Sequence, residues 1–235
     1  MTNVYRRRRA VLIFCISICI MLIGVINQLG ENKSVEQQNK KVQTTSNQQL
    51  AVDALDSLDV KGRAPKTGYA RDMFGNGWRK SGDCNTRDDV LARDMTQLDI
   101  RDCKVYAGIL DDPYTGKTIR FLRGPGTSSL VQIDHVVALS NSWQTGSQYL
   151  DSETRENLAN DPLELLAVDG KANQDKSDGD AATWLPPNKS YRCRYVARQI
   201  AVKQKYNLWV TSAERDAIKR VLSICPGQVL PTVTG

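Results

Sequence analysis

The chain has 235 residues, a formal net charge of +6, six cysteines and a single histidine. Four of the 32 lysine and arginine residues are Arg6 to Arg9, and no acidic residue precedes Glu31, so the rest of the chain carries 28 basic against 26 acidic residues. Net charge therefore does not indicate nucleic-acid binding, for which a local basic patch would be needed. One histidine also excludes chemistry that needs two or three imidazoles, such as a His-Glu-x-x-His zinc hydrolase.

The N-terminal segment has the pattern of a signal anchor. A basic segment, residues 1–9, precedes an uncharged and mostly apolar run of 17 residues from Ala10 to Ile26. That length is near the lower limit for crossing a bilayer, roughly 17–25 residues, and no obvious cleavage site follows it. We expect a transmembrane helix over residues 10–29, with residues 1–9 cytoplasmic and the rest of the chain outside. The alternative is a cleaved signal peptide, which would make the protein secreted.

Residues 30–60 are predicted to form a flexible polar linker. Up to about Leu50 this segment is rich in Gln, Asn, Lys, Ser and Thr, with too few apolar residues to bury a core. Near its end, Val52, Leu55 and Leu58 have the spacing of a short amphipathic helix. We expect one compact domain over residues 61–225, which is long enough for a sizeable core, and a loose tail over residues 226–235.

The first part of the domain is predicted to hold a helix and a strand. The helix runs over residues 87–98, with Thr86 as its cap, Asp89 as the acid of a capping box, and an apolar face that ends at Leu98. Residues 112–116, Asp-Pro-Tyr-Thr-Gly, form a strong turn signal. A strand is predicted after this turn, over residues 118–121.

The middle of the domain has the order strand, loop, strand, turn, helix. The first strand covers residues 130–133 and leads into Asp134 and His135. A short helix capped by Ser152 runs to residue 158, and Asn160 opens a turn. The second strand covers residues 163–168, and a helix is expected to begin at Asn173.

Two helices are predicted near the C-terminus, over residues 191–206 and 212–224, the second with a capping box formed by Thr211 and Glu214. Cys15 and Cys19 lie in the apolar run, which leaves four cysteines in the domain. An even number of cysteines in an exported domain suggests two disulfides. If the helices pair antiparallel about a turn near Trp209, Cys193 and Cys225 meet at the open end of the pair. This supports the bridge Cys193–Cys225 and leaves Cys84–Cys103 by elimination.

The pair Asp134 and His135 is the main candidate for chemistry. Adjacent residues on a strand point to opposite faces, so both can serve one substrate only if the strand ends between them. Asp134 can then hold a metal while His135 deprotonates a water molecule. Asn173 offers an amide oxygen, a hard ligand suited to Mg²⁺, and Lys176 lies one turn later on the same helix face. The alternative is a histidine that only packs in the core.

The order of these residues resembles a known family. Asp134-His135, then Asn160, then Asn173-Gln174-Asp175-Lys176 is similar to the HNH endonucleases, with their ββα-metal fold. A more specific resemblance, to exported HNH proteins related to the C-terminal domain of GmrSD-type restriction enzymes, extends over roughly residues 66–225. It is carried by residues 132–139, 160–168 and 181–189, together with Tyr69-Ala70-Arg71, Phe74-Gly75 and Trp78.

The resemblance implies a role for each matched residue. His135 would be the general base, and Asp134 and Asn173 would ligate a divalent metal, Mg²⁺ with Mn²⁺ as the alternative. Asn160 matches the position that orients the site by hydrogen bonds, although it also suits an ordinary turn asparagine. Asn173 stands where the family name has a histidine. Lys176 completes the catalytic set, with a solvated lysine as the alternative.

Four arginines are candidate contacts for nucleic-acid phosphates. Arg120 and Arg123 precede the predicted site, and Arg194 and Arg198 lie on the helix after it. The alternative is that this helix presents an ordinary solvated face.

The sequence therefore predicts an α+β fold, a ββα-metal (HNH) core embedded in a mainly helical, disulfide-stapled single domain, preceded by a transmembrane anchor. The predicted function is metal-dependent endonucleolytic hydrolysis of DNA, or alternatively RNA, outside the cytoplasm. No protein partner is predicted. Two other hypotheses are a surface nucleic-acid-binding protein without catalysis, for example in DNA uptake, and a cell-envelope polysaccharide hydrolase, for which no paired carboxylates are recognisable.

Overall fold

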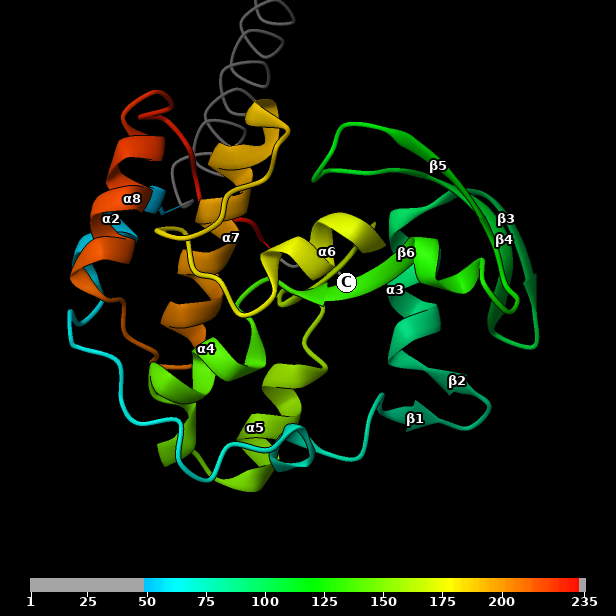
Figure 1. Cartoon of the computed structure of the whole chain (residues 1–235), viewed down its shortest axis with the longest axis horizontal. Coiled ribbons are helices and arrows are strands. Elements are labelled where there is room, and N and C mark those ends of the chain that lie inside the picture. The colour runs from blue at the N-terminus through cyan, green and yellow to red at the C-terminus, as the bar shows by residue number, and fades with distance from the viewer. Residues whose placement is uncertain (1–48, 233–235) are drawn as a thin grey trace, which may run out of the picture. The chain divides into compact units, whose positions relative to one another are not determined.

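The computed structural model describes residues 49–232 (Figure 1). The predicted cytoplasmic segment, the predicted transmembrane helix and the first part of the predicted linker lie outside the described residues. Among residues 49–232, no helix is long and apolar enough to cross a membrane.

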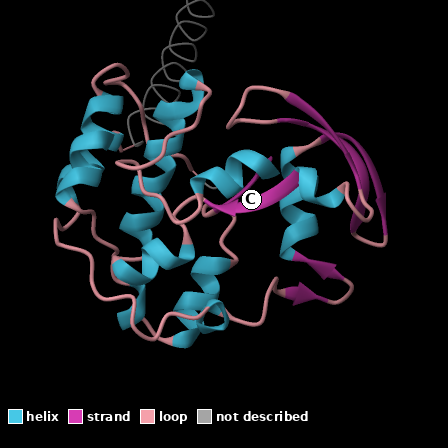
Figure 2. Ribbon diagram, in the orientation of Figure 1, coloured by secondary structure: helices cyan, strands magenta, loops and turns pink. Residues whose placement is uncertain are grey.

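The described part of the chain folds as one α+β domain (Figure 2). Its helices are α2 (Ala51–Ser57), α3 (Thr86–Asp94), α4 (Leu139–Gln144), α5 (Ser152–Ala159), α6 (Gly170–Lys176), α7 (Arg192–Lys205) and α8 (Ser212–Leu222). Its strands are β1 (Lys80–Ser81), β2 (Cys84–Asn85), β3 (Thr96–Arg101), β4 (Lys104–Asp111), β5 (Thr118–Leu122), β6 (Val131–His135) and β7 (Leu165–Asp169). Short 3₁₀ turns are η1 (Arg71–Phe74), η2 (Ser128–Leu130), η3 (Ser147–Tyr149) and η4 (Lys189–Tyr191).

The strands form three small antiparallel sheets, in the orders β1-β2, β3-β4-β5 and β6-β7. The curved β3-β4-β5 sheet lies to one side of the domain and the helices α2, α7 and α8 to the other, with β6 and α6 between them (Figure 1). The β6–β7 hairpin pairs His135 with Leu165 and Val131 with Asp169. The domain therefore has more strand structure than the mainly helical fold predicted from the sequence.

The predicted helix over residues 87–98 ends four residues early. Helix α3 stops at Asp94, and Leu98 belongs to β3. Leu98 nevertheless packs against the same cluster as Leu91, so the apolar spacing alone does not separate the helix from the strand. The cap also differs, because the side chain of Asn85 accepts a hydrogen bond from the backbone N–H of Asp88 and Thr86 is already helical.

The hydrophobic core has three clusters, and the β6–β7 hairpin lies between two of them. Leu166 and Val168 face a cluster built by α2, α7 and α8. Their neighbours Leu165 and Ala167 face a cluster built by α3 and the three-stranded sheet. The third cluster surrounds Trp143 and is built mainly by α4, α5 and α7. Because both faces are covered, β7 is apolar at consecutive positions instead of alternating.

The compact domain extends further in both directions than its predicted limits of residues 61 and 225. Ala51, Ala54 and Leu55 of α2 are completely buried against α7 and α8. Leu50 pairs with Val229 in an antiparallel β-bridge, so the first and last segments of the described chain are hydrogen-bonded to each other. The helical spacing recognised near the end of the linker is therefore a core element, and the first part of the predicted tail is ordered.

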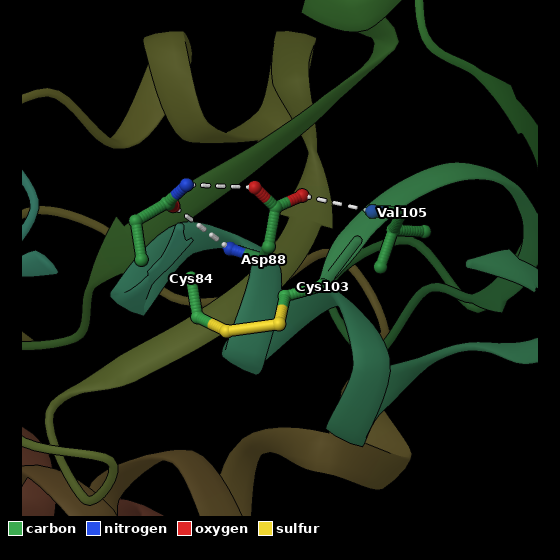
Figure 3. The surroundings of a disulfide bond; sticks show 5 residues. Cys84, Asp88, Cys103 and Val105 are labelled. Carbon is green, nitrogen blue, oxygen red and sulfur yellow. Dashed lines mark hydrogen bonds between the residues drawn. A yellow bond between two sulfur atoms is a disulfide. The ribbon is translucent and has the colours of Figure 1, made fainter. Parts of the chain in front are cut away.

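Both predicted disulfides are present. Cys193 and Cys225 join α7 to the end of α8, and Cys84 and Cys103 join β2 to the β3–β4 turn. Figure 3 shows Asp88 beside the Cys84–Cys103 bridge. The carboxylate of Asp88 accepts a hydrogen bond of 3.0 Å from the backbone N–H of Val105. The Cys84–Cys103 bridge joins residues 19 positions apart, and closing a loop of about that length stabilises a fold by about 3 kcal/mol.

The predicted capping box of Thr211 and Glu214 at the start of α8 is also confirmed.

Candidate active site

Strand β6 presents its polar residues to two different sides. Gln132 and Asp134 point towards α6, where they contact Asn173 and Lys176 respectively. His135 points to the opposite face, as the two-residue period of a strand requires. The strand continues through His135 instead of ending between Asp134 and His135, so the two side chains stand back to back at its last two positions.

The turn from β7 into α6 brings the helix close to β6. Asp169 caps α6, because its carboxylate accepts a hydrogen bond of 2.7 Å from the backbone N–H of Ala172. Gly170 follows, and a Cβ atom there would lie 2.0 Å from the carbonyl oxygen of Ser129, so only glycine allows this approach. The helix therefore begins three residues before Asn173, the predicted start, and Asn173 lies in its middle.

Asp134 is buried and held on both sides. Its Oδ1 accepts a hydrogen bond of 2.8 Å from Lys176 Nζ, and its Oδ2 accepts one of 2.5 Å from the hydroxyl of Tyr114. Burial raises the pKa of Asp134, while the positive charge of Lys176 and the hydrogen bonds oppose that rise. Lys176 is itself buried and also donates to the carbonyl oxygen of His135, at 2.8 Å, so the alternative of a solvated lysine is wrong.

Asn173 is oriented by Gln132. The amide nitrogen Nδ2 of Asn173 donates a hydrogen bond of 2.9 Å to Gln132 Oε1. Gln132 is itself oriented, because its Nε2 donates a hydrogen bond of 3.5 Å to the carbonyl oxygen of Ser129, which leaves its Oε1 to accept from Asn173. The oxygen Oδ1 of Asn173 accepts no hydrogen bond within the described residues, so it is free to bind a ligand.

His135 is held in place from two directions. Its Nε2 lies 3.0 Å from the carbonyl oxygen of Ala159, and its ring stacks on the indole of Trp78 at 5.7 Å between centroids and 7° between planes. Burial lowers the pKa of His135 to about 3, the contact with Ala159 opposes that fall, and the charges of Arg71 and Lys176 add to it. The imidazole is therefore neutral near pH 7.

Asn160 supports this arrangement without touching His135. Its Oδ1 accepts a hydrogen bond of 2.8 Å from the backbone N–H of Arg79, and its Nδ2 donates one of 3.0 Å to the carbonyl oxygen of Glu156. These contacts tie the segment carrying Trp78 to the end of α5, next to Ala159. Asn160 thus fixes both groups that position the imidazole.

Two pockets that share lining residues meet at the end of β6 and together form a groove. One part is lined by residues that include Asp134, His135, Asn173 and Asp178. A second part is lined by residues that include His135, Trp78 and the loop before Trp78. Arg71, His135 and Leu139 line both parts. Asp134 and His135 thus share one solvent-accessible site although they lie on opposite faces of the strand.

The donors in this groove fit a hard divalent cation. Asp134 offers carboxylate oxygens that keep lone pairs beyond those used by Lys176 and Tyr114, and Asn173 offers its free Oδ1. Mg²⁺ commonly binds through few protein groups and retains several waters. Within residues 49–232, no group of three or more His, Cys, Asp or Glu side chains is placed to hold a metal.

Two of the four arginines predicted to contact phosphates are engaged inside the protein. Arg123 forms an ion pair with the buried Asp88 and donates to the carbonyl oxygen of Val105. Arg198 donates to three carbonyl oxygens, those of Pro162 and Leu163 in the loop between α5 and β7 and that of Leu165 at the start of β7. Long side chains with several donors suit such internal roles. Arg120 and Arg194 are exposed, and neither lines the groove.

Three residues of the site were not recognised from the sequence as functional. Tyr114 comes from the β4–β5 turn, Trp78 from the segment before β1, and Gln132 from β6 itself. Gln132 had a detectable signal, because it lies two positions before Asp134 and so on the same strand face. Tyr114 contacts Asp134 and Trp78 contacts His135, and each pair is 20 or more residues apart in the sequence. Only folding brings these residues together.

Comparisons with known proteins identify the family of the chain. Residues 85–221, more than half of the chain, match the family described as GmrSD restriction endonucleases, C-terminal domain. A relative from Arthroderma benhamiae, named as an uncharacterized secreted protein, is 40% identical over 174 residues that cover 73% of this chain and 82% of the relative. No solved structure gives a significant match. The chain therefore belongs to the family of GmrSD restriction endonuclease C-terminal domains, an HNH-like nuclease family.

Proposed function

We propose that the protein is a metal-dependent endonuclease that hydrolyses phosphodiester bonds of DNA or RNA outside the cytoplasm. One observation carries this proposal. The only histidine of the chain, with one ring nitrogen engaged by a carbonyl group, lines the same groove as Asp134 and Asn173. A base and two oxygen ligands for a cation are what hydrolysis of a phosphodiester requires.

His135 is the proposed general base. A carbonyl oxygen can only accept a hydrogen bond, so the contact with Ala159 places the ring proton on Nε2. The other nitrogen, Nδ1, then has the free lone pair that can take a proton from an attacking water. A bound phosphodiester would raise the pKa of His135 above its low resting value, because a nearby negative charge stabilises the imidazolium.

Asp134 and Asn173 are the proposed ligands of the metal, Mg²⁺ or alternatively Mn²⁺. When bound, the cation would stabilise the negative charge that develops on the phosphate and the leaving oxygen. Lys176 and Tyr114 hold the Asp134 carboxylate, and Gln132 holds the Asn173 amide, so both ligands are oriented before any metal binds. In this proposal β6, β7 and α6 form the ββα-metal unit of an HNH nuclease.

An extracytoplasmic location is supported by several observations. The two disulfides suit an oxidising compartment, and the relative from Arthroderma benhamiae is named as secreted. The basic block and apolar run of residues 1–26 indicate export and, as part of this proposal, retention by an N-terminal anchor.

The test is cleavage of plasmid DNA, single-stranded DNA and RNA by the purified full chain, with Mg²⁺, with Mn²⁺ and with EDTA. We expect cleavage that requires the metal. His135→Ala should lower the rate by roughly 10²–10⁴-fold, the usual contribution of a general base. His135→Gln is the matched variant, since its amide nitrogen can reach the position of Nε2 and still donate to Ala159 but cannot accept a proton near neutral pH; it should lose as much activity as His135→Ala.

The melting temperature of each variant separates loss of chemistry from loss of fold. Full activity of both variants, or cleavage that is indifferent to EDTA, would overturn the mechanism. Salt-sensitive DNA binding without any cleavage would instead favour a nucleic-acid-binding protein. A fragment beginning at Lys61 should not be used, because it lacks the buried residues of α2.

A further inference from the structure

We propose that the cavity lined by His135, Trp78 and the loop before Trp78 binds the nucleoside next to the cleaved phosphate, that Arg71 contacts this phosphate, and that the substrate must be unpaired at this position. The inference rests on the proposed nuclease function and specifies its substrate class as single-stranded nucleic acid.

The cavity is large enough for one nucleoside. Its volume is about 320 Å³, within the range of small-ligand sites, roughly 300–1,000 Å³. It adjoins the proposed metal site directly, because His135 lines both parts of the groove. A substrate whose phosphate lies at His135 must therefore place its next group either along the surface or into this cavity.

The walls of the cavity suit a base and a sugar. Trp78 and Phe74 supply aromatic surface, Asn76 supplies an amide with both donors and an acceptor, and Asp72 supplies a carboxylate. Stacking on an aromatic side chain tolerates any base, because every base has a π-face. The carboxylate repels a phosphate, so the phosphate end of the ligand should lie away from Asp72, towards His135 and Arg71.

The loop that forms the cavity wall owes its open shape to glycine. Gly75 and Gly77 have φ values of +95° and +88°, a region that side-chain-bearing residues rarely adopt. A Cβ atom on Gly75 would lie 2.8 Å from the side chain of Glu156, whereas one on Gly77 would meet no atom within 4 Å. The loop is thus fixed against α5 on one side, with unfilled space at Gly77.

Arg71 is the cation placed to bind the phosphate. It is exposed, it lines both parts of the groove, and within the described residues no carboxylate forms an ion pair with it. Its charge is close enough to His135 to lower the pKa of the imidazole. Nearby Arg79 and Arg155 are both engaged by the protein itself. An unpaired guanidinium beside a catalytic base offers two hydrogen bonds to a phosphate.

The cavity is a recess open to solvent and not a flat surface, and this shape determines which substrates can use it. In a duplex each base is stacked between its neighbours and paired, so it reaches such a pocket only by flipping out of the helix at a cost of a few kcal/mol. A single strand enters without that cost. The geometry therefore favours single-stranded DNA or RNA over a duplex of the same sequence.

The test measures binding separately from cleavage. Fluorescence anisotropy of the full chain, in EDTA to prevent turnover, would compare a short single-stranded oligonucleotide with the same sequence as a duplex. We expect the single strand to bind at least tenfold more tightly. Equal affinity for the two forms would overturn the proposal, even if the protein proves to be a nuclease.

Variants locate the effect in the cavity. Asn76→Trp fills the space and should weaken single-strand binding about tenfold, a loss of the size attributed to one stacked base, whereas Asn76→Ala leaves the space open and should weaken it far less. Arg71→Gln should weaken binding and reduce its salt dependence, with partial recovery in Arg71→Lys. Arg220→Gln, at an exposed position of α8 outside the groove, is the matched control and should bind like the wild type.

Unchanged single-strand binding by Asn76→Trp and Arg71→Gln, with normal melting temperatures, would also overturn the proposal. Cleavage assays on the same samples report separately on the nuclease function. A protein that cleaves duplex and single strand at equal rates, and whose rates do not change in these variants, would be a nuclease without the proposed subsite.

Discussion

Two lysine–carboxylate pairs are buried within residues 49–232, and their surroundings differ. Lys176 pairs with Asp134 at 2.8 Å between β6 and α6, and the carboxylate borders the groove. Lys203 pairs with Glu214 at 3.1 Å between α7 and α8, where both side chains are completely buried. Each lysine also donates to a backbone carbonyl group, that of His135 or of Trp209.

The difference shows how one type of interaction can serve two purposes. Glu214 also closes the capping box of α8 with Thr211, so its pair with Lys203 joins two helices and is shielded from solvent. Asp134 keeps lone pairs that face the groove, so its pair with Lys176 orients a carboxylate for a ligand. Burial of charges seldom adds net stability. We therefore assign the Lys203–Glu214 pair to helix packing and the Lys176–Asp134 pair to holding a functional group in position.

The largest expected effect is that of Lys176→Met, which should reduce both stability and activity. Leaving Asp134 buried without its cation should cost about 3–5 kcal/mol of unfolding free energy. Loss of a group that orients a metal ligand should also lower the activity of the folded protein by about 10–100-fold. Urea unfolding and specific activity below the melting transition would measure the two effects.

The double variant Lys176→Met/Asp134→Asn provides the control for this prediction. It removes both charges, so it should recover much of the stability while remaining inactive. Recovery of activity together with stability would contradict the role of Asp134 as a ligand.

A second prediction concerns the pair in the helical region. Lys203→Met should cost a similar 3–5 kcal/mol, because Glu214 is left unpaired, but the folded fraction should keep its full specific activity. Lys203→Met/Glu214→Gln keeps a side chain able to close the capping box and should recover most of the loss. If Lys203→Met lowers the specific activity of the folded protein as far as Lys176→Met does, the two pairs do not differ in the way proposed.

The smallest expected effect involves Glu164, a third buried carboxylate, which forms no ion pair within residues 49–232. Burial raises its pKa well above the ordinary value of 4.5, and a hydrogen bond from the backbone N–H of Val137 opposes that rise. Above pH 4.5 the unfolded chain releases this proton while the native state retains it, so this residue lowers the stability as the pH rises.

Glu164→Gln should remove this contribution while retaining an acceptor for Val137. We expect the melting temperatures of variant and wild type to be similar near pH 4 and the variant to be more stable at pH 7.5, with about 2–4 °C for each kcal/mol gained. The same difference in melting temperature at both pH values would show that Glu164 does not titrate as its burial indicates.

Much of the local structure could be predicted from the sequence. Strands β6 and β7 follow from short apolar runs, the helix after them from the turn residues that end β7, and the C-terminal helices from their spacing and capping box. Errors occurred where local signals are ambiguous. The apolar residues of α3 continue into β3 without a break in spacing, so the end of the helix was placed too late. The helical spacing at Val52 and Leu55 follows a long polar segment, so this helix was assigned to the linker and not to the core.

The sequence by itself determined the family, the two disulfides and the identity of the candidate base, because motif order, cysteine number and a single histidine are local or countable properties. Only the tertiary structure decided which charged groups are available. Lys176 reaches Asp134 across 42 residues, Arg198 is engaged by a loop more than 30 residues away, and Arg71 forms no ion pair within the described part of the chain. The partner of a long cationic side chain depends on which backbone and carboxylate groups the fold brings near it, and residue type and spacing do not carry that information.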